Sequence, residues 1–109
     1  SQIKKVAKLI DNDLANLDSI EKIAEKVGLN INKLQLGFKH LYQTTVNGYV
    51  QKKRMILARN LLNNTDYNIS EIVEKIGLSS KSYFSKIFKE TYGISPSAFK
   101  KGNKSLRDK

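Results

Sequence analysis

One pattern of residues occurs twice in this chain, and it limits the fold more than any other feature. Residues 20–29 and 69–78 share six identities in ten positions. The identical pairs are Ile20/Ile69, Ile23/Ile72, Glu25/Glu74, Lys26/Lys75, Gly28/Gly77 and Leu29/Leu78. After the glycine the second copy has one extra residue, and Phe38, Lys39 and Tyr42 then align with Phe88, Lys89 and Tyr92. The chain is therefore expected to contain one supersecondary unit, built twice.

The repeated unit predicts a helix, a short glycine turn and a second helix. Its apolar residues recur at steps of three and four, the spacing of an amphipathic helix. Asp18 with Glu21, and Asn68 with Glu71, have the spacing of a capping box, and Asn30 can cap the second helix of the first copy. Gly28 suits the left-handed residue that ends a helix. This arrangement is typical of a helix-turn-helix, whose second helix enters the major groove of DNA.

The rest of the chain is also predicted to be helical. An apolar stripe over residues 3–17 predicts a first helix, a longer pattern runs from Val46 to about Leu62, and Ser95-Pro96 opens a short helix that should end near Lys101. We found no alternating strand pattern. The predicted fold is all-α and homeodomain-like, with about seven helices. Residues 1–45 are expected to form a first helix-turn-helix subdomain, 46–63 a central linker helix, 64–101 a second subdomain and 102–109 a basic, disordered tail.

Charge is distributed unevenly along the chain. Lys and Arg outnumber Asp and Glu by 20 to 10. Residues 1–30 are balanced, with five basic and five acidic residues, whereas residues 31–109 hold 15 basic and five acidic ones, so the entire net charge of +10 lies there. The two predicted recognition helices, about 31–42 and 80–91, carry Glu90 as their only acid, while Glu21, Glu25, Glu71 and Glu74 fall on the bracing helices. This segregation favours a polyanionic partner, most often nucleic acid.

Several classes of function are excluded or disfavoured by the composition. The chain has no cysteine and one histidine, which excludes disulfides, thiolate metal sites and a cysteine nucleophile. No apolar run approaches the roughly 18–20 residues that span a bilayer. The sequence shows no nucleophile–base pair, no pair of catalytic acids and no phosphate-binding glycine loop. We therefore expect that the protein is not an enzyme and binds no cofactor and no metal.

The residues alone leave alternatives to a sequence-reading regulator. An architectural or nonspecific DNA-binding protein would share the charge but show no preference among sequences. A protein-interaction module could use a basic helical face for acidic partners or a membrane surface, but it would not need two matched recognition helices.

Longer stretches of the sequence resemble the DNA-binding domain of the AraC/XylS family. The first block runs Val27-Gly28-Leu29-Asn30, Leu34, Phe38-Lys39, Tyr49-Val50, Arg54-Met55, Ala58 and Leu61-Leu62. The second runs Ile69, Glu71-Ile72, Ile76-Gly77-Leu78-Ser79, Ser82-Tyr83-Phe84-Ser85-Lys86, Phe88-Lys89, Gly93, Pro96 and Phe99-Lys100. Residues 36–55 look most like the siderophore-responsive branch of that family. Two departures are Gln43 in place of the usual Gly, and Leu36 where Arg is frequent.

The resemblance implies a bacterial transcription regulator and a set of DNA contacts. By that resemblance the base-facing positions are Asn32, Gln35, Leu36, Lys81, Ser82, Ser85 and Lys86. Their chemistry suits the role, because Asn and Gln pair with adenine, Lys reaches guanine and Leu can contact a thymine methyl. Point charges and hydroxyls suit phosphates better, and these are expected to be Lys33, Lys39, Lys53, Ser79, Ser80 and Lys89.

Two recognition helices in one chain are expected to bind two successive major grooves of DNA. A central helix of about 17 residues is about 26 Å long, and successive major grooves on one face lie about 34 Å apart, so a monomer is expected to occupy both. The implied partners are double-stranded promoter DNA and RNA polymerase, with no membrane, in the cytoplasm at the bacterial nucleoid. The chain starts at Ser1, and a processed or excised piece that lacks a separate N-terminal sensing or dimerisation domain is the expectation.

Overall fold

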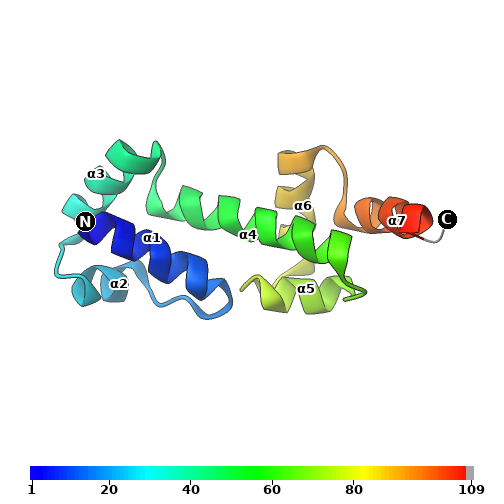
Figure 1. Cartoon of the computed structure of the whole chain (residues 1–109), viewed down its shortest axis with the longest axis horizontal. Coiled ribbons are helices and arrows are strands. Elements are labelled where there is room, and N and C mark those ends of the chain that lie inside the picture. Colours follow the sequence, from blue (N-terminus) through cyan, green and yellow to red (C-terminus); the bar gives the residue numbers. More distant parts are fainter. Residues whose placement is uncertain (108–109) are drawn as a thin grey trace. The chain divides into compact units, whose positions relative to one another are not determined.

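The computed structural model describes the backbone of residues 1–107 and the side chains of residues 1–103. Seven α-helices and one short 3-10 turn account for most of these residues, with no strand among them, which confirms the all-α prediction. In chain order they are α1 (Gln2–Asn12), the turn η1 (Leu14–Asn16), α2 (Ile20–Lys26), α3 (Ile31–Tyr42), α4 (Val46–Asn64), α5 (Ile69–Lys75), α6 (Lys81–Tyr92) and α7 (Pro96–Arg107) (Figure 1).

The chain divides into two compact units, each with its own apolar core. Unit 1 comprises residues 1–53 and unit 2 residues 54–109, so the boundary falls within α4. The core of unit 1 contains Val6, Ala7, Ile10, Ile23, Ala24, Leu34, Phe38, Val46, Tyr49 and Val50. The core of unit 2 contains Met55, Ala58, Leu62, Ile72, Val73, Ile76, Phe84, Ile87 and Phe88. The apolar stripes that define the predicted helices are thus the faces that each unit buries.

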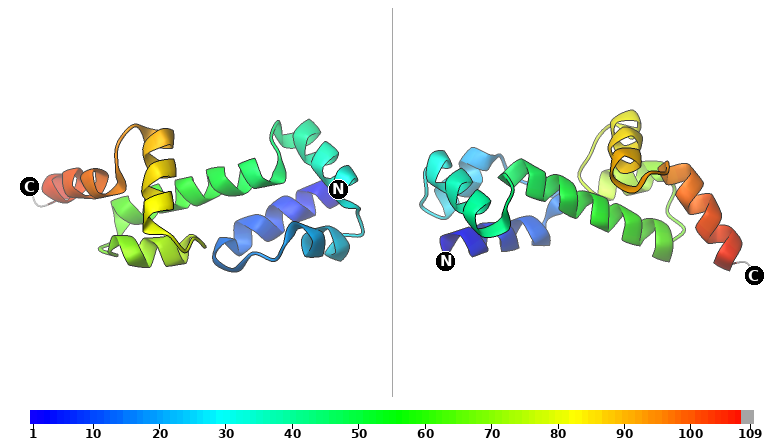
Figure 2. Two further views of the ribbon diagram at one scale, coloured as in Figure 1. Left: turned by 180° about the vertical axis from the view of Figure 1, so that it is seen from behind. Right: turned by 90° about the horizontal axis from the view of Figure 1, so that it is seen from above.

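The two copies of the repeat fold alike because the same glycine turn ends the first helix of each. Gly28 has φ +72° and Gly77 has φ +85°, a left-handed conformation that glycine adopts without steric cost. Leu29 N–H donates to Ala24 O at 2.9 Å, and Leu78 N–H donates to Val73 O at 3.0 Å. These bonds form a Schellman turn, which satisfies the last carbonyls of α2 and α5. The second helix then crosses the first steeply, as α6 crosses α5 in Figure 2.

Side-chain caps fix where the recognition helices begin. Asn30 Oδ1 accepts from Lys33 N–H at 2.8 Å at the start of α3, as predicted. Ser80 Oγ accepts from Tyr83 N–H at 3.1 Å at the start of α6. The predicted capping box of Asn68 and Glu71 at the start of α5 is present in full.

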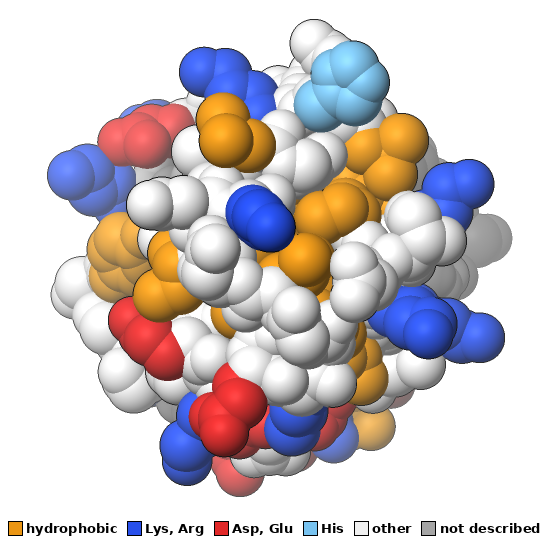
Figure 3. Space-filling model, turned by 90° about the vertical axis from the view of Figure 1, so that its left-hand side faces the viewer, with side chains coloured by type: hydrophobic (Ala, Val, Ile, Leu, Met, Phe, Trp, Pro, Cys, Tyr) orange, Lys and Arg blue, Asp and Glu red, His pale blue; other side chains and the backbone are white. Residues whose placement is uncertain are grey.

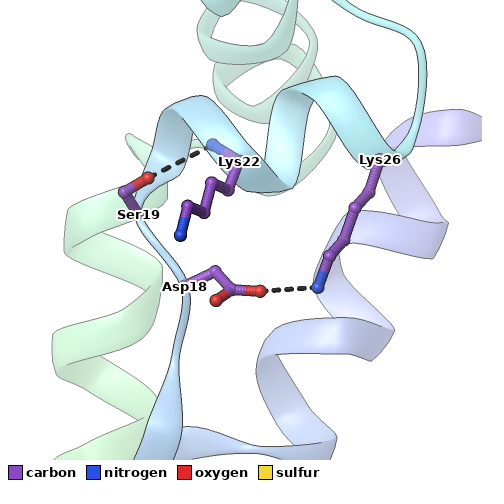
Figure 4. A network of polar contacts seen from close by, with 4 residues as sticks. All are labelled: Asp18, Ser19, Lys22 and Lys26. Atoms are coloured by element: carbon purple, nitrogen blue, oxygen red, sulfur yellow. Dashed lines mark hydrogen bonds and ion pairs between the residues drawn. The ribbon is translucent and has the colours of Figure 1, made fainter.

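The predicted cap of α2 is wrong by one residue. Ser19, rather than Asp18, is the N-cap, and its Oγ accepts from Lys22 N–H at 3.2 Å. The Asp18 carboxylate instead accepts from Lys26 Nζ at 2.5 Å (Figure 4). The hydrogen bond and the charge of Lys26 lower the pKa of the Asp18 carboxyl. Serine is as good an N-cap as aspartate, and Ser19 accepts a hydrogen bond from a backbone N–H group of the first turn. The Asp18 carboxylate is therefore available to pair with Lys26 at the end of α2.

Two helix ends also differ from the sequence-based expectation. The stripe over residues 3–17 is interrupted after Asn12, where Asp13 leaves the helical region (φ −147°), and η1 follows. At the other end, α7 continues past Lys101 to Arg107, so residues 102–107 do not form the expected disordered tail, and residues 108–109 lie outside the described part. Gly102 costs a helix only about 1 kcal/mol relative to Ala, and no proline follows to stop it.

Gly37 lies inside α3 because α1 packs closely against it. A Cβ atom at this position would be 2.5 Å from Ile3 Cδ1. Ile3 packs against the core of unit 1, so a larger residue at 37 would have to displace that side chain. Glycine is less favourable than alanine inside a helix. The close packing of α1 against α3, which only glycine permits at this position, offsets that loss of stability.

The ends of α3 and α6 offer a matched test of backbone strain. Gln43 follows α3 with φ +61°, and Gly93 follows α6 with φ +77°. Because a side chain in this region is strained, Gln43→Gly should raise the free energy of unfolding by about 0.5–1 kcal/mol, measured by urea denaturation. Gly93→Gln should lower it by a similar amount, since a Cβ there meets no atom within 4 Å and only the dihedral angle is penalised. Equal stability of both variants and the parent would contradict this account.

Candidate nucleic-acid interface

The outward face of α3 carries four of the predicted DNA-contacting residues of unit 1. Leu34 and Phe38 are fully buried, and positions on the opposite side of the helix are exposed. These exposed positions include Asn32, Lys33, Leu36 and Lys39. At 100° per residue, Leu36 lies opposite the buried stripe, at the centre of the outward face. A groove-sized helix with this face is able to present an amide, two cations and one apolar side chain to a partner.

Gln35 lies at the side of α3 and has a partner within the fold. Its Oε1 accepts from the backbone N–H of Val46 at 3.1 Å, and the bond is partly buried. Val46 is the first residue of α4, so Gln35 satisfies one of the N–H groups that the start of that helix leaves without an intrahelical acceptor. Bidentate pairing with adenine would need the same oxygen to accept a second hydrogen bond. Sequence reasoning did not anticipate this tie between α3 and α4.

The second copy cannot form the equivalent bond. Ser85 occupies the position of Gln35, and Pro96, which has no N–H, occupies the position of Val46. The difference was visible in the sequence, where a proline and a valine follow Ser95 and Thr45. Ser95 and Thr45 both cap their helices, through Ala98 N–H at 3.2 Å and Gly48 N–H at 3.0 Å.

This asymmetry predicts different stability effects at matched positions. Gln35→Ala removes the acceptor of Val46 N–H and should lower the free energy of unfolding of unit 1 by about 1 kcal/mol. Ser85→Ala should leave stability within about 0.5 kcal/mol of the parent. Hydrogen exchange at the Val46 amide would detect the lost bond directly. Unchanged exchange in Gln35→Ala would show that the bond contributes nothing.

The outward face of α6 is polar and cationic. Phe84, Ile87 and Phe88 are buried on its inner side. Lys81, Ser82, Lys86 and Lys89 are exposed, and Ser85 is half-buried. Tyr83 is 47% exposed and lies one turn before Lys86. The face therefore offers three ammonium groups and several hydroxyls.

The predicted phosphate contacts fall into two groups. Lys33, Lys39, Lys89, Ser79 and Ser80 are exposed on α3, on α6 or in the turn before α6. Lys53 is not on a recognition helix; it lies in α4, half-buried, 3.9 Å from Asp11 Oδ1 and 5.4 Å from the centre of the Tyr49 ring. Tyr49 also donates its hydroxyl hydrogen to Asp11 at 2.9 Å, and burial and this bond raise its pKa to about 12. Lys53 thus already belongs to a structural cluster in unit 1.

The recognition helix α3 itself carries no acidic residue. Glu21 and Glu25 are exposed on α2, and they line an open groove beside Ile31 and Asn32. In Figure 3 most of the acidic side chains occupy the lower half of the view, where α2 lies in Figure 1. Carboxylates are thus absent from α3 itself, and Glu21 and Glu25 lie beside its first turn at Asn32.

Neither a metal-binding cluster nor a membrane-spanning helix occurs in the described part of the chain. It contains no group of three or more His, Asp or Glu side chains placed to hold a metal ion. Its helices include none of the length and apolarity needed to cross a bilayer.

Comparisons with known proteins identify the helix-turn-helix and related regulators. A family model described as a helix-turn-helix domain matches residues 23–102. The regulatory protein PocR of Salmonella typhimurium is 34% identical over 100 residues, which are 92% of this chain and 33% of PocR. The chain spans about a third of the length of the curated relatives that it matches.

Solved structures share the helical fold of this chain. An AraC-type transcriptional regulator from Chromobacterium violaceum superposes with a TM-score of 0.85 at 25% identity, over 94% of this chain and 91% of that one. The DNA-binding domain of AdpA, solved in complex with a target DNA, superposes with a TM-score of 0.92 over 100% of this chain and 98% of that one. At 19% identity the second likeness shows the fold alone.

Proposed function

The chain belongs to the AraC/XylS family of helix-turn-helix DNA-binding domains, and on this premise we propose that it reads a bipartite sequence in double-stranded promoter DNA. In this proposal α3 and α6 enter successive major grooves of one duplex. Asn32, Gln35, Leu36, Lys81, Ser82, Ser85 and Lys86 face the bases. Lys33, Lys39, Lys89, Ser79 and Ser80 hold phosphates, with Lys53 as the least available of the predicted set.

One observation supports this function above others: two helices with matched frameworks expose polar, largely cationic faces. Each is braced by a shorter helix through the same glycine turn, and each buries its opposite face in a core. A duplicated, rigidly braced outward helix is what groove reading requires. A surface that served only solubility would need neither the duplication nor the segregation of acids.

The direct test is selection from a randomised duplex pool at about 150 mM salt, a physiological ionic strength, followed by sequencing. We expect an enriched site with two half-sites about 10.5 base pairs apart, one helical turn. Binding without an enriched motif would identify an architectural or nonspecific DNA-binding protein. Absence of binding to any duplex would favour a protein-interaction module.

The salt dependence of DNA binding measures the predicted phosphate contacts. Lys33, Lys39 and Lys89 are exposed cations on the recognition helices. If these three neutralise phosphates, the plot of log K against log salt should have a slope of about −2.7 or steeper, at about −0.9 per contact. A slope near zero, obtained from fluorescence anisotropy titrations, would contradict the proposal.

Two substitutions resolve which lysines contribute to that slope. Lys89→Ala should reduce its magnitude by about 0.9, because one counterion-releasing contact is lost. Lys53→Ala should change the slope far less, since Lys53 is engaged by Asp11 and Tyr49. The opposite ranking would place Lys53 on the DNA and remove Lys89 from it.

The wider role of the protein follows from the same proposal. RNA polymerase and a separate sensing or dimerisation domain are its further expected partners, and the greater length of the curated relatives supports the second. The protein acts as a binding module at the bacterial nucleoid rather than as an enzyme.

A further inference from the structure

Leu36 is the most exposed of the large apolar side chains in the described part of the chain. It is 72% exposed, against 47% for Tyr83 and less for the others. It occupies the centre of the outward face of α3, opposite the buried stripe. Its i±3 and i±4 neighbours on this face are polar and exposed, and they are Asn32, Lys33, Lys39 and His40.

This setting restricts what can cover Leu36. An apolar patch for a protein partner or a membrane would be contiguous, whereas here one isobutyl group is surrounded by an amide, two ammonium groups and an imidazole. The fitting occupant is a polyanion that presents a small apolar group between its charges. The thymine C5-methyl group in the major groove, flanked by phosphates, has this chemistry.

The position of α6 that corresponds to Leu36 in the repeat has the opposite chemistry. Lys86 occupies the position of Leu36 in the repeat and is exposed on α6. The neighbouring positions differ as well, because Gln35 Oε1 is engaged by Val46 N–H, whereas the second copy has Ser85 and Pro96 at these two positions, and proline has no N–H. The centre of the outward face of α3 is therefore poor in hydrogen-bonding groups, and that of α6 is rich in them.

We propose that the two recognition helices read DNA by different chemistry, α3 through a C5-methyl group against Leu36 and α6 through hydrogen bonds to base acceptors from Lys86 and its neighbours. This inference rests on the proposed function and assigns the base class of each half-site. Gln35, one of the base-facing residues of the proposed function, also ties α3 to the start of α4 through its Oε1. The half-site under α3 carries a thymine at its centre, and the half-site under α6 carries guanine acceptors.

The test changes single methyl groups on the DNA. In the duplex selected from the random pool, each thymine is replaced in turn by deoxyuridine, which lacks only the C5-methyl. We expect one replacement in the half-site under α3 to weaken binding about fourfold, the factor for burying one methyl-sized group. Replacing that T·A pair by 5-methyl-C·G should bind more tightly than C·G by a similar factor, because the methyl group is restored.

Two variants assign the effect to Leu36. Leu36→Ala should bind the thymine and deoxyuridine duplexes equally, and its exposure means that the fold is retained, which thermal unfolding checks. Leu36→Lys makes α3 resemble α6 at this position, and a repeated selection should move the preference at that pair from thymine to guanine.

The outcomes separate this inference from the proposed function. Equal affinity of the parent for every deoxyuridine duplex, with a bipartite site still enriched, overturns the inference alone. A methyl effect that persists in Leu36→Ala also overturns it, because another residue then contacts the methyl group. Failure to enrich any site overturns the proposed function.

Discussion

Phe88→Ala should lower the free energy of unfolding of unit 2 by about 3–5 kcal/mol, the usual cost of emptying a fully buried aromatic position. Phe88 is fully buried, and its ring contacts those of Phe84, Tyr92 and Phe99 at centroid distances of 5.6, 4.8 and 5.7 Å. Units of this size have only marginal stability. The loss is therefore enough to unfold unit 2, which comprises the second part of α4 with α5, α6 and α7. Circular dichroism would show this as roughly half of the helical signal lost at 25 °C.

The control for this prediction is the other core. The buried clusters of the two units share no residue, so amide hydrogen exchange in α1–α3 should stay protected in Phe88→Ala. Phe88→Leu keeps most of the apolar volume and should cost less. Collapse of protection in α1–α3 together with unit 2 would contradict two separate cores and require them to unfold as one.

Lys86→Glu should weaken binding to the selected DNA site by about 100-fold or more at physiological salt. Loss of a good contact to a base edge costs about 1–3 kcal/mol, or about 5- to 150-fold, and the new carboxylate adds repulsion from the phosphates. The side chain is exposed on the outward face of α6, so stability should remain close to that of the parent. Fluorescence anisotropy with the selected duplex measures the affinity, and urea denaturation measures the stability.

Lys8→Glu is the matched control for net charge. Lys8 is exposed on α1, away from both recognition helices in sequence, and the substitution changes the total charge by the same amount. We expect it to weaken binding only a few-fold, through the long-range field. Equal effects of the two variants would mean that bulk charge, and not a contact from α6, drives binding.

Much of the fold was predictable because its determinants are local. The spacing of Ile69, Ile72 and Ile76 marks a buried helix face, Asn68 with Glu71 marks its start, and Gly77 marks its end; each signal acts within one or two turns of chain. Predictions failed where two local solutions compete. Ser19 and Asp18 both suit an N-cap, and only Lys26, which pairs with Asp18, distinguishes them.

The exposed faces of α3 and α6 were predictable from the sequence, but the contacts of individual side chains were not. Gln35 and Leu36 are adjacent in the sequence and received the same role from the resemblance. In the fold, one side chain turns to Val46 and the other is 72% exposed. Lys53, likewise, was grouped with the phosphate contacts, although it lies against Asp11 and Tyr49.

The type of the elements, the duplicated helix-turn-helix and the sign of its charge follow from local sequence, because helix periodicity, caps and glycine turns are properties of neighbouring residues. Which polar side chains are engaged within the fold, and which face outward, is visible only in the folded chain. Those assignments depend on contacts between residues far apart in the chain, such as Tyr49 with Asp11 and Gln35 with Val46. Packing of the helices, and not the local pattern, brings these pairs together.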